Sequence, residues 1–304
     1  MLLCVMVLAF TFLLASMAFA GGFEITEFPL VRKGPPLHLH RIAAEGGGDA
    51  GQLLMVHGLT YSSHEFDVDA GDYSLARFFA SKGWSVWLLD IAGYGSSGEV
   101  ENGFLPNSDY AAEDIAAAAA LILKESGQKK LDVLGWSWGT VTGGRFAARY
   151  PEMVRKIVLY APIVAGLGEY EVTAPFNKNT WEDAAGDFQT AEGGAIDYEI
   201  TEPAVVATFL SNCWRYDGKG SPNGGRKDLL VSGDKRLIPT SAIKSPALVI
   251  TGDRDPYVTV ELCKEAAAEL KGSTLKVIRG ASHAMMMEKP YYKEFREAVL
   301  DFLK

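Results

Sequence analysis

The amino-acid sequence predicts an α/β protein with a mostly parallel central sheet and helices on both of its faces. The first observation is that short apolar runs alternate with stretches of helical length from about residue 52 onward, a pattern typical of βα units. The second is the size of the chain: 304 residues, 48% of them hydrophobic, can bury one large core. The third is a long segment, residues 165–242, that interrupts the alternation. Because structureless loops of this length are rare inside a compact domain, this segment predicts an inserted subdomain.

The predicted elements follow one another in a simple order. FEITEFPLV and LHLHRIAA indicate an antiparallel pair of strands around Gly34-Pro35-Pro36. Next we expect a strand at 53–58, a helix at 73–83, a strand at 84–90, a helix at 108–127, a strand at 131–136, a helix at about 139–149 and a strand at 156–164. After the insertion we expect a strand at 246–252, a helix at 259–272, a strand at 274–280 and a last helix at 290–304. Residues 21–164 and 243–304 therefore form the predicted core, and residues 165–242 a predicted cap.

The first twenty residues, MLLCVMVLAFTFLLASMAFA, carry no charge and end in Ala18-Phe19-Ala20. Small residues on either side of one spacer are the pattern that a signal peptidase cleaves. We therefore expect a secretory signal peptide, cut after Ala20, and a secreted or periplasmic protein. The usual positive residues before the apolar run are missing, and a run of this length could also span a bilayer as an uncleaved anchor. Only in that second case do we expect contact with a membrane.

Charge and cysteine content narrow the classes of partner and chemistry. The formal net charge of −9 argues against nucleic acid as a partner, because phosphate backbones attract basic surfaces. The acidic first half of the insertion is explained by a solvated surface. Of the three cysteines, Cys4 lies in the signal segment, and Cys213 and Cys263 lie outside any CxxC or His-rich context. We interpret these two as packed or disulfide-paired thiols rather than as catalytic groups.

The stretch LDVLGWSWGT, residues 131–140, carries the strongest chemical signal. Residues 135–139 fit G-x-S-x-G around Ser137, with a predicted strand before the motif and a predicted helix after it. A strand that turns at once into a helix crowds the backbone around the serine, so glycine is needed two residues before and two after it. The pattern predicts Ser137 as an exposed nucleophile. The N–H of Trp138, at the start of the helix, is then a candidate donor to a developing oxyanion.

A serine nucleophile needs a base, and the base needs an orienting acid. His283 lies in the loop between the last predicted strand and the last predicted helix, and no other histidine follows Ser137. Two carboxylates, Asp253 and Asp255, lie in the loop TGDRDPYV after the preceding strand. Both loops follow strands of the predicted sheet, so their side chains can hang over its carboxyl edge. Serine, acid and histidine are therefore expected to meet there.

The order of these residues resembles the α/β-hydrolase superfamily, in which nucleophile, acid and base follow one another along the chain. Two further motifs carry the resemblance. HGLT (57–60) is similar to the oxyanion loop of the family, and DIAGYGSSG (90–98) is similar to its Asp-x-x-Gly-x-Gly-x-Ser loop. The resemblance covers residues 23–164 and 243–304, and it says nothing about the insertion or the substrate.

The resemblance implies roles for residues that the spacing alone leaves open. It implies that the Leu59 N–H is a second oxyanion donor beside Trp138. It also favours Asp255 over Asp253 as the acid, because Asp255 matches the family's Gly-x-x-Asp offset from Gly252. Asp253 stays as the alternative.

Several other histidines and glycines have plainer explanations. His57 precedes a glycine turn, and we expect it to form structural hydrogen bonds rather than to act as a second base. His38 and His40 lie on one face of a strand, but no third ligand accompanies them, so we expect no metal site. The Gly93–Gly95 stretch lacks the complete nucleotide fingerprint and is expected to form a tight turn.

A serine at position 137 predicts acyl transfer through a covalent acyl-enzyme. The sequence therefore predicts a secreted serine hydrolase that cleaves carboxylic esters, small-molecule or polymeric, without a metal or an organic cofactor. A lactonase, an aminopeptidase, a C–C bond hydrolase or an acyltransferase would use the same serine, and a non-catalytic binding module is the alternative of another class. Trp136, Trp181 and Trp214 are candidates for substrate contacts, with ordinary packing as the alternative. Nothing in the sequence indicates the oligomeric state.

Overall fold

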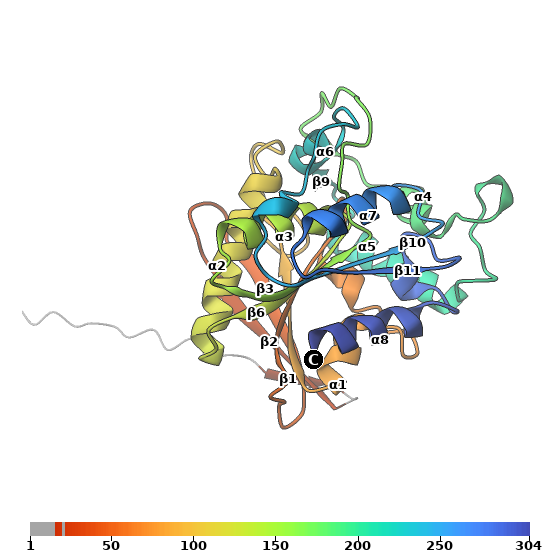
Figure 1. Ribbon diagram of the computed structural model, residues 1–304. Helices are drawn as coiled ribbons and strands as arrows, with labels where there is room; N and C mark the ends of the chain where they lie inside the picture. Colours follow the sequence, from red (N-terminus) through yellow and green to blue (C-terminus); the bar gives the residue numbers. More distant parts are fainter. Residues whose placement is uncertain (1–15, 20–21) are drawn as a thin grey trace, which may run out of the picture.

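The computed structural model describes residues 16–19 and 22–304 (Figure 1). Its centre is a nine-stranded sheet in the order β1-β2-β3-β5-β4-β6-β7-β10-β11. Strands β5, β4, β6, β7, β10 and β11 run parallel to one another, and β1, β2 and β3 pair antiparallel. This confirms the predicted mostly parallel α/β sheet. The strands are β1 (Ser16–Phe19), β2 (Phe23–Leu30), β3 (Leu37–Ala44), β4 (Gly51–Val56), β5 (Trp84–Asp90), β6 (Leu131–Trp136), β7 (Val154–Tyr160), β10 (Ala247–Gly252) and β11 (Thr274–Ile278).

Helices cover both faces of the sheet. On one face, Phe79 and Phe295 belong to a common apolar core, and on the other, Ile115 and Phe146 belong to a second core. The inner parallel strands β4, β5, β6 and β10 are buried on both faces, which explains why they appear in the sequence as continuous apolar runs. The helices that pack on the sheet are α1 (Leu75–Ser81), α2 (Ser108–Ser126), α3 (Trp138–Arg149), α7 (Val260–Glu269) and α8 (Tyr292–Leu303).

Local signals set where these helices begin and end. The Ser74 side chain accepts the N–H of Arg77 at the start of α1, and the Asn107 side chain accepts two N–H groups of the first turn of α2. Gly127 has a φ of 69° at the end of α2, in the left-handed region that glycine adopts at no steric cost. The helix predicted at 108–127 therefore forms almost as expected.

The strand predicted at 156–164 is shorter than expected at its end. The extended conformation stops at Tyr160, because Ala161 has a φ of 47° and Pro162 follows it. A residue with positive φ cannot continue a β-strand. Residues 161–164 consequently leave the sheet toward the insertion.

Residues 165–242, called the cap from here on, follow this turn. An isolated antiparallel bridge between Ala165 and Arg236 brings the two ends of the cap together. Figure 1 shows α6 and β9 above α3, and α4 farther to the right. The cap contains β8 (Phe176–Asn177), α4 (Trp181–Ala184), α5 (Pro203–Asp217), β9 (Ser221–Pro222) and α6 (Gly224–Leu229), with 3-10 turns η2 (Gly186–Phe188), η3 (Glu192–Gly194) and η4 (Thr240–Ala242). In the core there are two more such turns, η1 (Ser63–Phe66) and η5 (Met285–Met287).

The predicted signal segment, residues 1–20, lies outside the described residues apart from Ser16–Phe19, which form β1 against β2. Cleavage after Ala20 would remove β1 and leave β2 at the edge of the sheet. In the part of the chain that the structure describes, no helix is long and apolar enough to cross a membrane.

Candidate active site

Ser137 lies at the sharp turn between β6 and α3. Its backbone has a φ of 54° and a ψ of −120°, a conformation that persists only where the surroundings enforce it. A Cβ on Gly135 would lie 2.2 Å from the carbonyl oxygen of Gly139, and a Cβ on Gly139 would lie 2.2 Å from the carbonyl oxygen of Val56. Both contacts are with backbone and cannot relax cheaply. Glycine is therefore required on both sides of the serine, for the steric reason that the motif predicts.

His283 and Asp255 form a buried hydrogen-bonded pair. His283 Nδ1 donates to Asp255 Oδ2 over 2.7 Å, and both side chains are almost completely buried. The other oxygen of Asp255 accepts two backbone N–H groups of its own loop, at 2.9 and 3.2 Å, which holds the carboxylate in place. Asp253 instead accepts the N–H of Gly280 at 2.6 Å. Of the two carboxylates, the structure thus brings Asp255 to the histidine.

The surroundings of His283 raise its pKa above the ordinary value of 6.5. Burial by itself lowers this pKa, because the charged ring loses hydration. The charge of Asp255 and its hydrogen bond outweigh burial, and the charges of Asp187 and Glu288 act in the same direction. The ring is therefore a stronger base than an isolated histidine, which suits proton abstraction from a hydroxyl.

Trp136 fixes the loop that carries His283. Its indole Nε1 donates a hydrogen bond of 3.1 Å to the His283 carbonyl oxygen, and the Tyr160 hydroxyl donates another of 2.8 Å to the same atom. The rings of Trp136 and Tyr160 stack with centroids 5.7 Å apart. Trp136 also lines the cavity in front of Ser137. It therefore both packs in the core and shapes the cavity.

The loop 58–60 passes next to Ser137. A Cβ on Gly58 would lie 3.4 Å from the Ser137 Cβ, so the two segments are in van der Waals contact. Leu59 lines the same cavity as Ser137, and Trp138 is the first residue of α3. Among the described residues, neither the Leu59 N–H nor the Trp138 N–H donates a hydrogen bond outside the helices and strands. Both N–H groups predicted as oxyanion donors are thus adjacent to the serine, and no carbonyl oxygen of a described loop or turn accepts a hydrogen bond from either of them.

Glu65 lies against this loop, and the sequence analysis did not single it out. Its Oε1 accepts the N–H of Gly58 over 2.7 Å, and its side chain is buried. Burial raises the pKa of the Glu65 carboxyl well above its ordinary value, which favours the protonated form. Glu65 is one of three acidic residues in the stretch YSSHEFDVD that follows HGLT, and no local pattern distinguishes it from Asp67 and Asp69.

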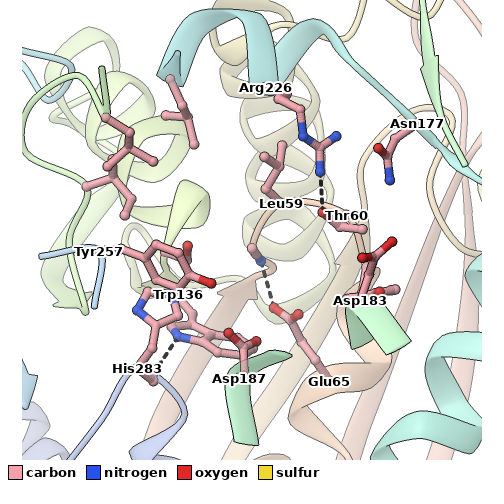
Figure 2. Close-up of a pocket in the computed structure, with 16 residues that line it drawn as sticks. Leu59, Thr60, Glu65, Trp136, Asn177, Asp183, Asp187, Arg226, Tyr257 and His283 are labelled. Atoms are coloured by element: carbon pink, nitrogen blue, oxygen red, sulfur yellow. Dashed lines mark hydrogen bonds between the residues drawn. The ribbon is translucent and has the colours of Figure 1, made fainter. Parts of the chain in front are cut away.

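Ser137 and His283 open into a cavity of about 360 Å³ between the core and the cap. Figure 2 shows Tyr257, Trp136 and His283 on one side of it and Arg226 and Asn177 on the other. Among the described residues no hydrogen bond joins Ser137 Oγ to His283, a contact that often tightens only when substrate binds. The residues that line the cavity are Gly58, Leu59, Thr60, Tyr61, Glu65, Trp136, Ser137, Ile163, Leu167, Asn177, Asp183, Asp187, Arg226, Leu229, Tyr257 and His283.

The cap contributes three charged side chains to this cavity, Asp183, Asp187 and Arg226. Burial raises the pKa of Asp187, the neighbouring His283 lowers it and Asp255 raises it again, with a net increase. Burial lowers the pKa of Arg226. Both aspartates belong to the acidic first half of the insertion, and Asp183 is exposed, as expected of a solvated surface, whereas Asp187 is half-buried.

Trp181 and Trp214, two of the candidate substrate contacts, are not among the residues that line this cavity. Their rings touch each other edge to face, with centroids 6.3 Å apart, and they are 44% and 55% exposed. The reason is the packing of α4 against α5, which turns both rings outward. The structure therefore does not bring these two side chains, predicted as substrate contacts, to the cavity at Ser137.

The residues expected to be structural have structural partners. Both ring nitrogens of His57 are hydrogen-bonded to backbone groups, and His38 Nδ1 lies 3.1 Å from Asp90 Oδ2. No cluster of three or more potential metal ligands occurs among the residues that the structure describes. Cys213 and Cys263 are both buried and free, so they do not form the disulfide that was one of the alternatives.

A strained serine follows β6 at the carboxyl edge of a mostly parallel sheet, and a carboxylate and a histidine follow β10 and β11 at the same edge; this is the arrangement of one class of enzyme. This chain is an α/β-hydrolase. Residues 49–290 match the model of the family described as serine aminopeptidase, S33. Because the match extends over more than half of the chain, the protein belongs to this family.

Individual proteins similar to this chain are hydrolases of several kinds. A monoacylglycerol lipase of Mycolicibacterium smegmatis is 28% identical over 252 residues, which cover 81% of this chain and 82% of the relative. An uncharacterized carboxylesterase of Bacillus subtilis is 24% identical over 264 residues, 83% of this chain and 79% of the relative. Among solved structures, the enol-lactonase of Burkholderia xenovorans superimposes with a TM-score of 0.65 at 22% identity, over 90% of this chain and 99% of that one. That last likeness shows the shared fold.

Proposed function

We propose that the protein hydrolyses carboxylic esters through a covalent acyl-enzyme, with Ser137 as nucleophile, His283 as general base and Asp255 as the acid that orients the histidine. The observation that carries the proposal is the buried 2.7 Å contact between Asp255 and His283 at the cavity that Ser137 also lines. The names of the similar lipase and carboxylesterase support the same bond type. A cavity of about 360 Å³ suits a small or medium-sized ester at the reacting bond.

In the proposed reaction, Ser137 Oγ attacks the ester carbonyl carbon while His283 takes the hydroxyl proton. The tetrahedral oxyanion accepts hydrogen bonds from the N–H groups of Leu59 and Trp138. When the intermediate collapses, the C–O bond to the alcohol breaks and His283 returns the proton to the leaving oxygen. Water then attacks the acyl-enzyme with His283 again as base, which releases the carboxylic acid and restores Ser137. Asp255 stabilises the imidazolium that forms in both halves.

A second candidate substrate class is favoured by one observation. Asp183 and Asp187 line the cavity from the cap, and carboxylates at that place would attract a protonated amine on the acyl group. Cleavage of aminoacyl esters or amides by the same serine would use this charge. A substrate panel that contains both neutral and aminoacyl esters, a lactone and an aminoacyl arylamide separates the two candidates by their kcat/KM values.

The decisive variant is Ser137→Ala. We expect it to abolish hydrolysis of p-nitrophenyl esters, because no other group in the proposed site can form the acyl-enzyme, and to abolish labelling by a fluorophosphonate probe. The unfolding midpoint should stay near that of the unchanged protein, because the side chain loses only its hydroxyl. Labelling that persists in the alanine variant would disprove the role of Ser137.

We also propose that the protein is exported. This proposal rests on the uncharged apolar segment and on Ala18-Phe19-Ala20 at its end. After expression of the full chain in a secreting host, we expect protein outside the cytoplasm whose sequence begins at Gly21. Recovery of the uncleaved chain in the membrane fraction would favour the anchor instead.

A further inference from the structure

The short helix α6 of the cap lies directly on both residues whose N–H groups are the proposed oxyanion donors. A Cβ on Gly225 would lie 2.6 Å from Cε2 of the Trp138 indole and 2.9 Å from Cδ1 of Leu59. Such distances leave no room for a side chain. The backbone of α6 is therefore in close contact with the side chains of Trp138 and Leu59, the two residues that supply the proposed donors.

The next residue of α6, Arg226, binds the loop that carries one of these donors. Its Nη2 donates a hydrogen bond of 2.9 Å to Thr60 Oγ1, seen in Figure 2 as the dashed line below the guanidinium. The carbonyl oxygen of Thr60 accepts a further bond of 3.3 Å from the Asn179 side chain, also in the cap. Thr60 has a φ of 85°, a conformation that costs free energy for a residue with a Cβ. Contacts with the cap thus hold the strained residue that follows Leu59.

Arg226 has a polar rather than an ionic environment. Its guanidinium donates to Thr60 Oγ1 and, over 2.6 Å, to Asn223 Oδ1. Within the described part of the chain, Arg226 forms no ion pair within 4.0 Å, and the charge of Asp183 acts on it only from a greater distance. A half-buried guanidinium without an ion pair keeps its place through such directed hydrogen bonds. Its orientation toward Thr60 is therefore fixed by the structure and not by a competing charge.

Helix α6 is itself anchored to the core. The N–H of Gly224 donates to the carbonyl oxygen of Gly103 over 2.8 Å, and the Asp228 carboxylate accepts the N–H of Ser108 over 2.8 Å. Ser108 in turn accepts the indole N–H of Trp138 over 2.9 Å. The helix is therefore connected to the start of α2, to the indole of Trp138 and to the oxyanion loop.

We propose that α6 positions the oxyanion site, with Arg226 acting through Thr60 to align the Leu59 N–H. Arg226 is then a positioning residue and does not touch the reacting atoms. This inference rests on the proposed function, because it concerns the transition state of acyl transfer at Ser137. It makes the cap part of the catalytic alignment and not only a cover over the substrate.

The test compares Arg226→Met, Thr60→Val and the double variant. Each single change removes one end of the same hydrogen bond at nearly constant volume. We expect each to lower kcat for a p-nitrophenyl ester by about 10- to 100-fold, with little change in KM, because the contact acts only when the oxyanion forms. The double variant should be no worse than the more affected single variant. Lys227→Met, an exposed change on the same helix, is the matched control and should retain full activity.

A second measurement separates alignment of the oxyanion site from general damage. The sulfur of a matched thionoester accepts hydrogen bonds poorly, so its hydrolysis depends less on the donors. We expect the ratio of ester to thionoester kcat/KM to fall in Arg226→Met and in Thr60→Val, but not in Lys227→Met. If Arg226→Met does not fold, as judged by its thermal unfolding, Thr60→Val tests the same bond from the core side.

Other outcomes overturn the proposal in distinguishable ways. Additive losses in the double variant, or a rise in KM confined to Arg226→Met, would show that Arg226 binds substrate directly. Unchanged kcat and ester-to-thionoester ratio in both single variants would show that α6 is only structural. The rate of fluorophosphonate labelling of Ser137 provides a reference that does not need an ester. An unchanged protein that neither hydrolyses esters nor reacts with the probe would disprove the proposed function itself, and this inference with it.

Discussion

At the scale of single residues, the strained backbone of Ser137 is held by the fold before any substrate binds. Its N–H donates to the carbonyl oxygen of Tyr160 over 3.0 Å. Its carbonyl oxygen accepts the N–H and the hydroxyl of Thr140, at 2.9 and 2.5 Å. These three hydrogen bonds fix the turn, so the energetic cost of the conformation is met during folding and not during the reaction.

The first residue-scale prediction concerns the acid. Asp255→Asn should lower kcat/KM by about 10³- to 10⁴-fold, because an amide cannot stabilise the imidazolium and favours the wrong ring tautomer. Asp253→Asn should leave most of the activity, because Asp253 contacts the Gly280 backbone and not His283. Steady-state kinetics with one p-nitrophenyl ester compares the two. A larger loss in Asp253→Asn would mean that the acid is wrongly assigned.

The second residue-scale prediction concerns how kcat/KM depends on pH. Only neutral His283 can take the proton, and its pKa lies above 6.5, so kcat/KM should rise with pH through a midpoint above that value. The negative charge of Asp187 raises this pKa, so Asp187→Asn should move the midpoint to lower pH. Asp183→Asn is the control, since Asp183 lines the cavity but is not among the groups that raise the pKa of His283. A midpoint that moves upward in Asp187→Asn would contradict the electrostatic explanation.

A functional residue could be predicted from the sequence when the pattern that marks it is local, and not when its partner lies far away along the chain. Ser137 is marked by glycines two positions away, and His283 and Asp255 by their places after strands, so local patterns are sufficient. Arg226 meets Thr60 across 166 positions of the chain, and no local pattern encodes such a contact. Side chains whose function depends on docking of the cap therefore stayed unidentified.

At the scale of elements, the junction between β6 and α3 allows a sharp test of the steric argument. A Cβ on Gly139 would meet the carbonyl oxygens of Val56 and His57 at 2.2 and 2.8 Å. Gly139→Ala should therefore lower the free energy of unfolding by about 1–3 kcal/mol and abolish ester hydrolysis, because the turn must shift. Gly143→Ala on the same helix is the control: its Cβ would meet only a Val133 methyl at 3.5 Å. It should be neutral or stabilising by up to about 1 kcal/mol. Equal effects of the two changes in urea unfolding would refute the argument.

Some strands and helices could be predicted from the sequence and others could not. Strands such as β4 and β5 are fully buried, and an unbroken apolar run identifies them with an error of a few residues at most. The early end of β7 depends on a positive φ at Ala161, a residue type that gives no warning of it. Two helices of the cap, α4 and α6, have only four and six residues, which is too short for a clear apolar period in the sequence.

At the scale of the whole molecule, one of the groups that attach the cap to the core is a buried carboxylate at the end of α5. One oxygen of Asp217 accepts the N–H and the hydroxyl of Ser62, at 2.9 and 2.7 Å, and the other accepts the N–H of Gly95 at 2.8 Å. Ser62 and Gly95 belong to the loops after β4 and β5. The group thus joins the cap to the two loops that surround the site, and burial raises its pKa to about 6 even though these three donors lower it.

The raised pKa predicts how the stability of the molecule depends on pH. Between about pH 4 and 6 the folded chain keeps a proton on Asp217 that the unfolded chain has lost, so the contribution of this group to the free energy of unfolding decreases as pH rises. Asp217→Asn should cost about 1–3 kcal/mol, because its amide N–H faces a donor. This deficit should be largest near pH 4 and shrink toward pH 7, since the amide does not titrate. Urea unfolding at each pH measures it, with the exposed Lys219→Gln as control. A deficit that stays constant or grows with pH would show that Asp217 is not the buried titrating link between cap and core.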